Sequence, residues 1–353
     1  MYDSNFDMQR LMFHPGEVAH WLEHGQSRGP LYTEMALSTR CNCRCVFCGV
    51  DYLVNKTHDD IETADAKRII DELHGLGNRA VMFAGHGESL LHTDALEIIS
   101  HASAKMSTSV TTNGYPLDDA KLPLIDGLKW IRFSINGCDA ANYAAVHRVP
   151  EAAFDQVMTN LERAVERKRS RKLGVVIGVQ LVLLDENAGE LVDFARRLKA
   201  VGVDYFSVKP FSQHPLSECQ LKPDYAAQAH LEDALEALQD ESFKVIYRAR
   251  SIDRVNSEKR YEKCHGTHFI SFVSANGNVC ECNVFDGDPR FLTGNAREES
   301  LGAIWRGPRR QAVLDFIDHD LDIAKECRDI CRMDECNCYL DRLKNPMDHD
   351  DFI

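Results

Sequence analysis

The strongest constraint on the fold is an alternation of short apolar segments with amphipathic ones, from about residue 32 to residue 210. Segments of strand length, rich in apolar and β-branched residues, lie at 31–37, 80–84, 108–112, 130–135, 174–183 and 204–208. Segments with helical periodicity separate them, notably 63–76, 154–168 and 189–200. This order predicts an α/β fold with a parallel sheet, helices outside it and chemistry at the carboxyl ends of the strands. Six such units make an open, partial (β/α)6 TIM-like barrel.

The pattern changes after Pro210. A helical stretch at 224–239 is followed by a polar, basic segment at 247–263, which we interpret as a linker. HFISFVSANGNVCEC predicts a hairpin that turns at Asn276 and Gly277, and two helices are expected around 301–317 and 322–343. We therefore expect an N-terminal helical extension, a barrel, a helical linker region and a small cysteine-rich domain, over 1–30, 31–215, 216–263 and 264–353.

The net charge and the hydropathy of the chain limit which partners the protein can bind and where in the cell it is expected. The net charge of -14 argues against a nucleic-acid partner, because phosphate binding needs clustered lysine and arginine. No segment approaches the roughly 20 apolar residues of a membrane helix, and the N-terminus lacks a signal-peptide core. We expect no membrane association and a cytoplasmic protein.

Thirteen cysteines indicate metal or redox chemistry in a reducing compartment, where disulfides are rare. LSTRCNCRCVFC places Cys41, Cys45 and Cys48 in C-x3-C-x2-C spacing, directly after the first predicted strand. Three thiolates can hold three irons of a [4Fe–4S] cluster and leave the fourth iron open to bind another molecule. A zinc site, with Cys43 as fourth ligand, is the alternative.

This spacing, with an aromatic residue before the last cysteine, resembles the signature of the radical S-adenosylmethionine (SAM) superfamily. Segments after the next three strands are similar to its SAM-binding motifs: GHGES to Gly-Gly-Glu-Pro, TTNG to Thr-Asn-Gly, and FSING to a segment whose Ser or Asn contacts SAM. In the GHGES segment, His86 stands where the family motif has its first Gly, and Ser89 stands where it has Pro. The resemblance makes Cys43 a spectator and implies SAM contacts from Phe47, Gly85, Gly87, Glu88, Thr112, Asn113, Ser134, Asn136 and Arg148.

The later cysteines predict an auxiliary cluster. The pattern C-x12-G-x4-C, followed by a late cysteine pair, resembles the SPASM domain and the shorter twitch domain that carry auxiliary iron–sulfur clusters in this superfamily. Twitch fits better, because no cysteine follows Cys338. We expect one auxiliary cluster, [4Fe–4S] in type, on Cys264, Cys282, Cys327 and Cys331. A structural zinc site is the alternative, and Cys280, Cys336 and Cys338 are near enough in sequence to compete as ligands.

The resemblance also suggests a reaction. An auxiliary cluster that accepts an electron from a substrate radical turns hydrogen abstraction into oxidation, as in the similar enzyme 2-deoxy-scyllo-inosamine dehydrogenase. Such chemistry requires an external one-electron reductant such as flavodoxin or ferredoxin. A cysteine that returns a hydrogen atom would instead make an epimerase, and Cys138 and Cys219 are candidates because each follows a predicted strand.

A small polyhydroxylated substrate, such as a sugar, cyclitol or nucleoside, is favoured because only about 30 residues precede the first strand, where peptide-modifying relatives carry an extra domain. Lys209, Gln213 and His214, after the sixth strand, are the candidate substrate-binding residues. Peptide modification and a non-enzymatic role as an iron–sulfur electron carrier are the remaining alternatives. The sequence names neither the substrate nor the position attacked.

Overall fold

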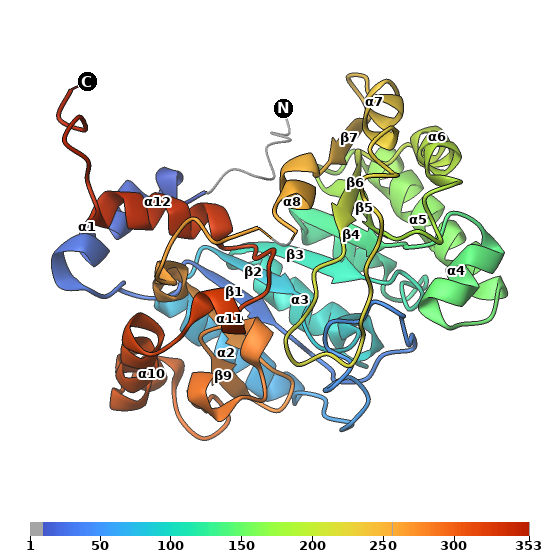
Figure 1. The fold of residues 1–353 in the computed structure, drawn as a ribbon. Coiled ribbons are helices and arrows are strands. Elements are labelled where there is room, and N and C mark those ends of the chain that lie inside the picture. The colour runs from blue at the N-terminus through green and yellow to red at the C-terminus, as the bar shows by residue number, and fades with distance from the viewer. Residues whose placement is uncertain (1–9, 256, 353) are drawn as a thin grey trace.

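One ten-stranded sheet, in the order β10-β9-β8-β1-β2-β3-β4-β5-β6-β7, organises the protein (Figure 1). The structure is a computed structural model that describes residues 10–255 and 257–352. Strands β1 to β7 are all parallel to their neighbours. Their bounds are Tyr32–Met35, Ala80–Phe83, Ser107–Thr112, Trp130–Ser134, Val176–Leu183, Tyr205–Pro210 and Lys244–Tyr247. All parallel strands therefore present their carboxyl ends at the same edge.

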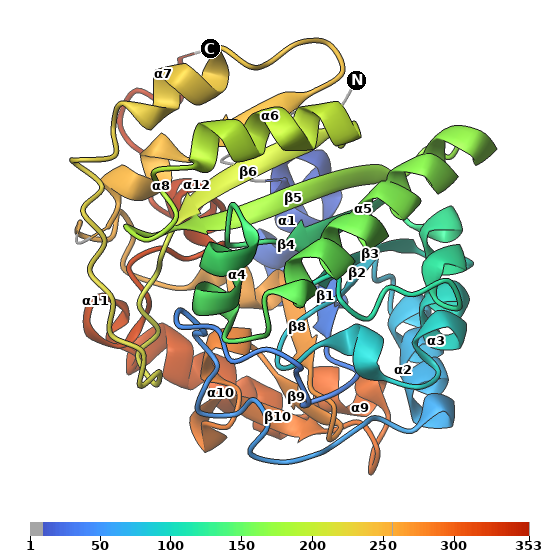
Figure 2. The ribbon, with the colours of Figure 1, turned by 90° about the vertical axis from the view of Figure 1, so that its right-hand side faces the viewer.

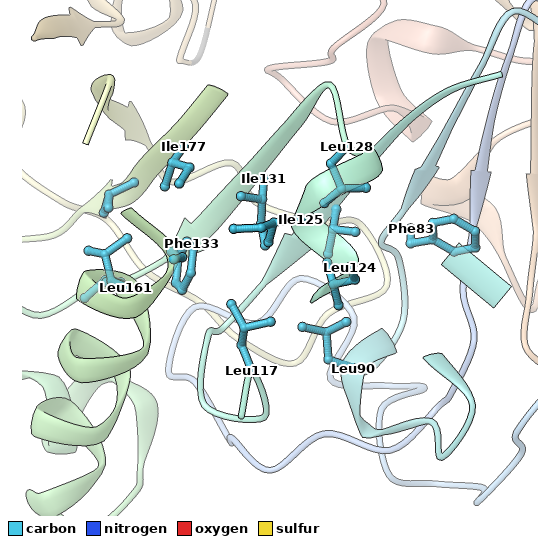
Figure 3. Packing of buried hydrophobic residues seen from close by; sticks show 14 of the residues in the cluster. Phe83, Leu90, Leu117, Leu124, Ile125, Leu128, Ile131, Phe133, Leu161 and Ile177 are labelled. Atoms are coloured by element: carbon cyan, nitrogen blue, oxygen red, sulfur yellow. The ribbon is translucent and has the colours of Figure 1, made fainter. Parts of the chain in front are cut away.

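Helices cover the outside of this sheet, and the curved arrangement is seen from the side in Figure 2. They are α2, α3, α4, α5, α6 and α7, over Thr63–Gly75, Ala95–Ser103, Ala140–His147, Ala152–Arg171, Leu191–Val201 and Leu231–Glu236. Each longer helix buries one apolar stripe against the strands, as in α2, where Ala66, Ile69, Ile70 and Leu73 are buried. Figure 3 shows this core, with Phe133 and Ile177 of the strands packed near Leu161 of α5.

The six predicted strands and the partial barrel are confirmed, and the sheet has a seventh parallel strand, β7, that was not predicted. β7 pairs in parallel with β6 within the segment between the predicted helix and the predicted linker. The predicted alternation of strands and helices ends near residue 210, so the segment at 244–247 was not assigned as a strand, and its pairing with β6 identifies it. The expected helix at 224–239 is also shorter, since only Leu231–Glu236 is α-helical.

The C-terminal hairpin has the expected turn. β8 (Ile270–Val273) and β9 (Asn278–Cys280) pair in antiparallel fashion, and Gly277 takes a left-handed φ of 87° between them. A third strand that was not predicted, β10 (Leu292–Asn295), pairs with β9.

The two helices expected after this hairpin are each divided. The first is α9 (Leu301–Arg306) and α10 (Pro308–His319), because Pro308 cannot continue a helix and instead begins a new one. The second is α11 (Ile323–Glu326) and α12 (Asp334–Lys344), separated by the loop with Cys327 and Cys331.

The cysteine-rich region is continuous with the barrel sheet, because β8 lies parallel to β1 and pairs with it. Helix α1 (Pro15–His24) packs on α12 through Trp21 and Leu340, which belong to one buried apolar cluster. The expected N-terminal extension therefore contacts the C-terminal domain, although residues 1–9 of that extension lie outside the described residues. The remaining short helices are α8 (Ala249–Asp253) and 3-10 turns at Leu11–Phe13, Ser89–Leu91, Leu122–Gly127, His265–Phe269, Asn283–Phe285 and Pro289–Phe291. Within the described ranges, no helix has the length and apolarity needed to cross a membrane.

Candidate active site

The loop after β1 carries Cys41, Cys45 and Cys48 and is fixed from two sides. Asn55 binds Cys41 twice, since its Oδ1 accepts a hydrogen bond from Cys41 N at 3.0 Å and its Nδ2 donates to the Cys41 carbonyl at 3.1 Å. Val46 N donates to the carbonyl of Val146 in α4 at 2.9 Å. The loop is thereby held at the carboxyl end of β1, where parallel-barrel enzymes place their chemistry.

Cys43 lies among the other thiols of this loop. It is 3% exposed, and its backbone N–H donates to Cys41 Sγ at 3.4 Å. Its thiol and burial raise the pKa of Cys41, and burial raises the pKa of Cys48 to about 11. A bound metal is therefore what would hold these sulfurs as thiolates at neutral pH.

His147 contacts the same loop, and the sequence analysis missed it. Its Nδ1 lies 3.3 Å from Cys45 Sγ, and its Nε2 accepts a hydrogen bond from Asn136 N at 3.0 Å. A backbone N–H can only donate, so Nε2 is unprotonated and the ring proton resides on Nδ1, directed at the Cys45 sulfur. Burial lowers the pKa of His147 to about 3, so the ring is neutral. Cys43, Cys45 and His147 also form the described group whose ligand atoms could hold a metal, all within 4.8 Å of one another.

Glu88, at the end of β2, joins the next two predicted SAM motifs. Its Oε1 accepts hydrogen bonds from Leu90 N at 3.1 Å and from Thr112 Oγ1 at 2.9 Å, and its Oε2 accepts from Asn113 N at 2.7 Å. Burial raises the pKa of this carboxyl. Asn113 Nδ2 in turn donates to Asn42 Oδ1 in the cysteine loop at 2.7 Å. The motifs of β2, β3 and the cysteine loop therefore meet, as the sequence predicts.

The backbone path of the GHGES segment after β2 needs a glycine at both of its glycine positions. Gly85 and Gly87 take left-handed φ values of 109° and 85°, and a Cβ on Gly87 would lie 2.4 Å from the Ser38 carbonyl oxygen. His86 between them replaces a glycine of the family motif. Its Nδ1 lies 2.5 Å from Asp286 Oδ2, so this motif contacts the cysteine-rich domain.

The remaining predicted SAM contacts lie around the end of β4 and α4. Asn136 is buried, and its Oδ1 accepts a hydrogen bond from Val182 N of β5 at 2.8 Å. Phe47 packs edge-on to His147 with ring centroids 6.1 Å apart. Ser134 ends β4, and Arg148 ends α4 with a left-handed φ of 54° and an exposed side chain.

The four cysteines expected to hold the auxiliary cluster surround one pocket. Cys264, Cys282, Cys327 and Cys331 line it together with apolar side chains such as Phe285 and Ile317. Burial and the neighbouring sulfurs raise the pKa of Cys264, and burial first and then Cys282 raise that of Cys327 to about 12. No carboxylate or imidazole lines this pocket in the described part of the chain, and an all-thiolate donor set suits an iron–sulfur cluster.

Two of the three competing cysteines face other surroundings. Cys280 Sγ lies 3.6 Å from Asp286 Oδ1 and packs in a separate apolar cluster, and Cys336 lines a second cavity beside α1. Cys338 packs against the same apolar cluster as Cys264, Cys282 and Cys327, and it lies near Arg260. None of these three lines the four-cysteine pocket.

A cavity of about 460 Å³ lies inside the barrel and connects it to the auxiliary pocket. Six strands contribute one or more side chains each, and the auxiliary-site cysteines Cys282 and Cys331 also line it. Its size is within the usual range for small-molecule sites. The strand residues among its lining are Tyr32, Glu34, Met82, Trp130, Arg132, Gln180, Lys209, Pro210 and Ile270.

The predicted substrate residues do not all reach this cavity. Lys209 lines it, but Gln213 Nε2 donates to the backbone of His214, and His214 packs on Tyr52 of the cysteine loop with ring centroids 5.2 Å apart. Lys209 and Pro210 at the end of β6, and Ser212 just after it, line the cavity, whereas Gln213 and His214 do not.

The two candidate hydrogen donors point elsewhere as well. Cys138 Sγ donates to the Asn187 carbonyl at 3.3 Å within the main core, and Cys219 Sγ contacts the Val46 carbonyl beneath the cysteine loop. Neither residue is among those that line the cavity. Cys138 and Cys219 were expected to reach the pocket because each follows a predicted strand. In the described residues neither of them does.

Comparison with known families agrees with the two groups of cysteines. A model of the radical SAM superfamily matches residues 35–198, and a model of the SPASM iron-sulfur cluster-binding domain matches residues 264–337. The chain carries a radical SAM domain followed by a SPASM domain. The cofactors are therefore SAM, the [4Fe–4S] cluster that binds it, and auxiliary iron–sulfur chemistry. The zinc alternatives do not explain both matches.

Relatives of this radical SAM protein differ in what they make. GTP 3',8-cyclase of Chlorobaculum tepidum is 27% identical over 191 residues, which cover 52% of this chain and only 56% of the cyclase. AdoMet-dependent heme synthase of Methanosarcina barkeri is 24% identical over 301 residues, or 79% of this chain and 83% of the synthase. The crystal structure of Streptococcus suis SuiB bound to S-adenosylmethionine has a TM-score of 0.66 at 16% identity and covers 90% of this chain and 74% of SuiB. The structural likeness shows the shared fold.

Proposed function

We propose that this protein reductively cleaves SAM and abstracts a hydrogen atom from a small molecule held in the barrel cavity, oxidising an alcohol with the auxiliary cluster as electron acceptor. The observation that carries the proposal is the shared cavity wall. Barrel residues such as Gln180 and Lys209 line it together with Cys282 and Cys331. A substrate bound there contacts both the barrel strands and the auxiliary-site cysteines.

Cys41, Cys45 and Cys48 would hold a [4Fe–4S] cluster whose open iron would bind SAM, and this pair would supply the 5′-deoxyadenosyl radical for hydrogen abstraction. The protein itself supplies polar groups for the substrate, a proton acceptor and apolar walls. Burial, followed by the charge of Arg328, lowers the pKa of Lys209 to about 7. Its amine can therefore take the hydroxyl proton at neutral pH, which an arginine cannot.

The proposed oxidation balances as a two-electron reaction. The substrate would give up one hydrogen atom to the radical, one proton to Lys209 and one electron to the auxiliary cluster that Cys264, Cys282, Cys327 and Cys331 would hold. An external one-electron reductant, such as flavodoxin or ferredoxin, starts each turnover. The substrate on this proposal is a hydroxylated small molecule such as a sugar, cyclitol or nucleoside, and the protein acts in the cytoplasm.

The first test is SAM cleavage by the anaerobically reconstituted protein. With reductant, wild type should form 5′-deoxyadenosine, and Cys45→Ala should abolish it because the open-iron cluster loses a ligand. Cys280→Ala is the matched control, since that cysteine lies outside both groups of proposed ligands. Absence of 5′-deoxyadenosine from wild type with full iron content would refute the proposal. Deuterium transfer from labelled polyols into 5′-deoxyadenosine then identifies the substrate.

The second test concerns the auxiliary cluster. Cys282→Ala should lower the iron content by about one cluster and suppress product formation more than SAM cleavage, because only the electron acceptor is lost. Equal loss of both activities would contradict the assigned role of the cluster.

Two alternatives remain for the same radical chemistry. Epimerisation needs a hydrogen donor, and neither Cys138 nor Cys219 lines the cavity, which favours oxidation. Peptide modification is favoured by the structure of SuiB bound to its precursor peptide SuiA, which has a TM-score of 0.65 with this chain. Assays with peptides, run beside the polyol assays, separate these functions.

A further inference from the structure

The barrel cavity is basic, although the whole chain carries a net charge of -14. Arginines from four separate parts of the chain line it: Arg10, Arg132 of β4, Arg248 before α8, and Arg328 and Arg332 in the loop before α12. Glu34 is the one carboxylate among the described lining residues. Such a concentration of one sign of charge in a cleft attracts ligands of the opposite sign.

The known negative groups neutralise only part of this charge. Glu34 Oε2 lies 2.7 Å from Arg332 Nη1, which accounts for one arginine. An oxidised [4Fe–4S] cluster with four thiolates carries about two negative charges, and Arg328 and Arg332 lie near Cys282 and Cys331. Five arginines outweigh one carboxylate and one cluster, so the charge balance of these lining groups is positive by about two.

Arg132 is the clearest example of the excess positive charge in the cavity. It projects from the middle of β4, and its Nη2 donates to the neutral Thr111 Oγ1 at 3.2 Å. Its Nε is buried and has no hydrogen-bond acceptor among the described residues. Arg328 likewise donates only to Ser212, at 3.3 and 3.4 Å, in the contacts described for it. Guanidinium groups prefer carboxylates and phosphates, which they bind through paired hydrogen bonds.

Lys209 shows that these charges act on one another across the cavity. The charges of Arg328, Arg132 and Arg248 oppose protonation of its amine, in addition to burial. The three arginines therefore face a common space from β4, from the segment before α8 and from the auxiliary-cluster loop. A ligand that brings negative charge into this space relieves the repulsion between them.

We propose that the substrate is an anion with at least two carboxylate or phosphate groups, bound by Arg132, Arg248 and Arg328 in the cavity between the barrel strands and the auxiliary cluster. This inference rests on the proposed function, since it names the substrate class for the same site. It also revises the neutral polyol: the hydroxylated carbon that is oxidised belongs to an acidic molecule.

The test is anaerobic isothermal titration calorimetry on the full-length reconstituted protein with SAM. The probes are tricarballylate for carboxylates, fructose 1,6-bisphosphate for phosphates, and myo-inositol as a neutral molecule of similar polarity. Wild type should bind one anionic probe at a single site and bind myo-inositol at least about tenfold more weakly. Which anion binds more tightly distinguishes a carboxylate substrate from a phosphate substrate.

Arg132→Gln should weaken binding of the anion about tenfold or more, because a hydrogen-bonded charge pair is lost. Arg132→Lys keeps the charge and should lose less, which separates a binding role from a folding defect. Arg309→Gln is the matched control, since Arg309 is exposed in α10, outside the cavity. Equal binding of myo-inositol, no binding of either anion, or anion binding unchanged in Arg132→Gln overturns the inference. Formation of 5′-deoxyadenosine by wild type is scored separately, so its absence refutes the proposed function and not the anion site.

Discussion

A buried ion pair next to the auxiliary cluster yields the sharpest stability prediction. Arg310 of α10 and Glu281 are each 1% exposed, and Arg310 Nε lies 2.7 Å from Glu281 Oε1. The guanidinium also lies 3.5 Å from the centre of the Trp305 ring. Glu281 stands between Cys280 and the proposed ligand Cys282, so this pair ties α10 to the cluster-bearing segment.

Replacing Arg310 with methionine keeps much of the apolar packing but leaves the Glu281 carboxylate buried without its cation. Removal of one partner of a buried ion pair costs about 3–5 kcal/mol. With a urea m-value of about 3 kcal/mol/M for a chain of this size, the unfolding midpoint should fall by about 1–1.7 M. Circular dichroism of anaerobically reconstituted proteins in urea measures this midpoint.

The neighbouring Arg309 provides the control. It is exposed, so Arg309→Met should change the midpoint little, since exposed charges contribute about 0–1 kcal/mol. The double variant Arg310→Met, Glu281→Leu removes both charges and should recover most of the loss. The reasoning is refuted if Arg310→Met and Arg309→Met have the same midpoint, or if the double variant is the least stable of all.

The pH dependence of the same variant has a definite sign. Burial raises the pKa of Glu281, and Arg310 opposes that shift. Without Arg310 the carboxyl takes up a proton more readily on folding, so the folded variant binds more protons than the unfolded chain. The stability deficit of Arg310→Met should therefore shrink as the pH falls from 8 towards 5, and a deficit that grows would contradict the assignment.

Three further predictions follow from the site. His147→Phe removes the N–H directed at Cys45 and should lower the midpoint potential of the SAM cluster by about 20–65 mV, the one-electron equivalent of about 0.5–1.5 kcal/mol. An EPR-monitored redox titration measures this potential, and an unchanged value would refute the hydrogen bond. Gly87→Ala should abolish SAM binding in equilibrium dialysis because its Cβ would overlap backbone atoms, whereas Gly189→Ala, with nothing within 4 Å, should bind normally; binding by both variants contradicts the strained turn. Lys209, with its pKa lowered to about 7, holds its proton less tightly in the fold than in the unfolded chain, which lowers the free energy of unfolding wherever the unfolded chain is still protonated. Lys209→Met should therefore be more stable than wild type near pH 6, with the gain declining as the pH rises towards 10 in urea titrations, and a constant gain would oppose this pKa.

The elements with strong periodicity could be predicted, and those defined by pairing could not. The strands β1 to β6 lie in segments that are rich in apolar or β-branched residues and alternate with helical segments, so they are visible without a structure. β7 and β10 lie outside this alternation and are identified by the strand beside them. The division of the helix at 301–317 had a local signal, because Gly307 and Pro308 form a helix stop and a new start.

For the site, residues in local motifs were predictable and residues that converge from distant segments were not. Cys41, Cys45 and Cys48 follow a fixed spacing within one loop, and Glu88 and Asn113 follow strands at the same sheet edge. His147 reaches Cys45 only because α4 folds over the loop. Asp286 likewise reaches His86 only because the hairpin extends the barrel sheet.

The sequence by itself determined the parallel barrel, the open-iron cysteine motif and the cysteine-rich domain, because each depends on periodicity or spacing within a short segment. The tertiary structure alone decided which residues line the cavity. Arg10, Arg132, Arg248 and Arg328 are spread over more than 300 positions, and each looks like an ordinary charged residue in its own segment. Their common charge becomes a property of one site only when the strands, the N-terminal segment and the auxiliary-cluster loop enclose the same space.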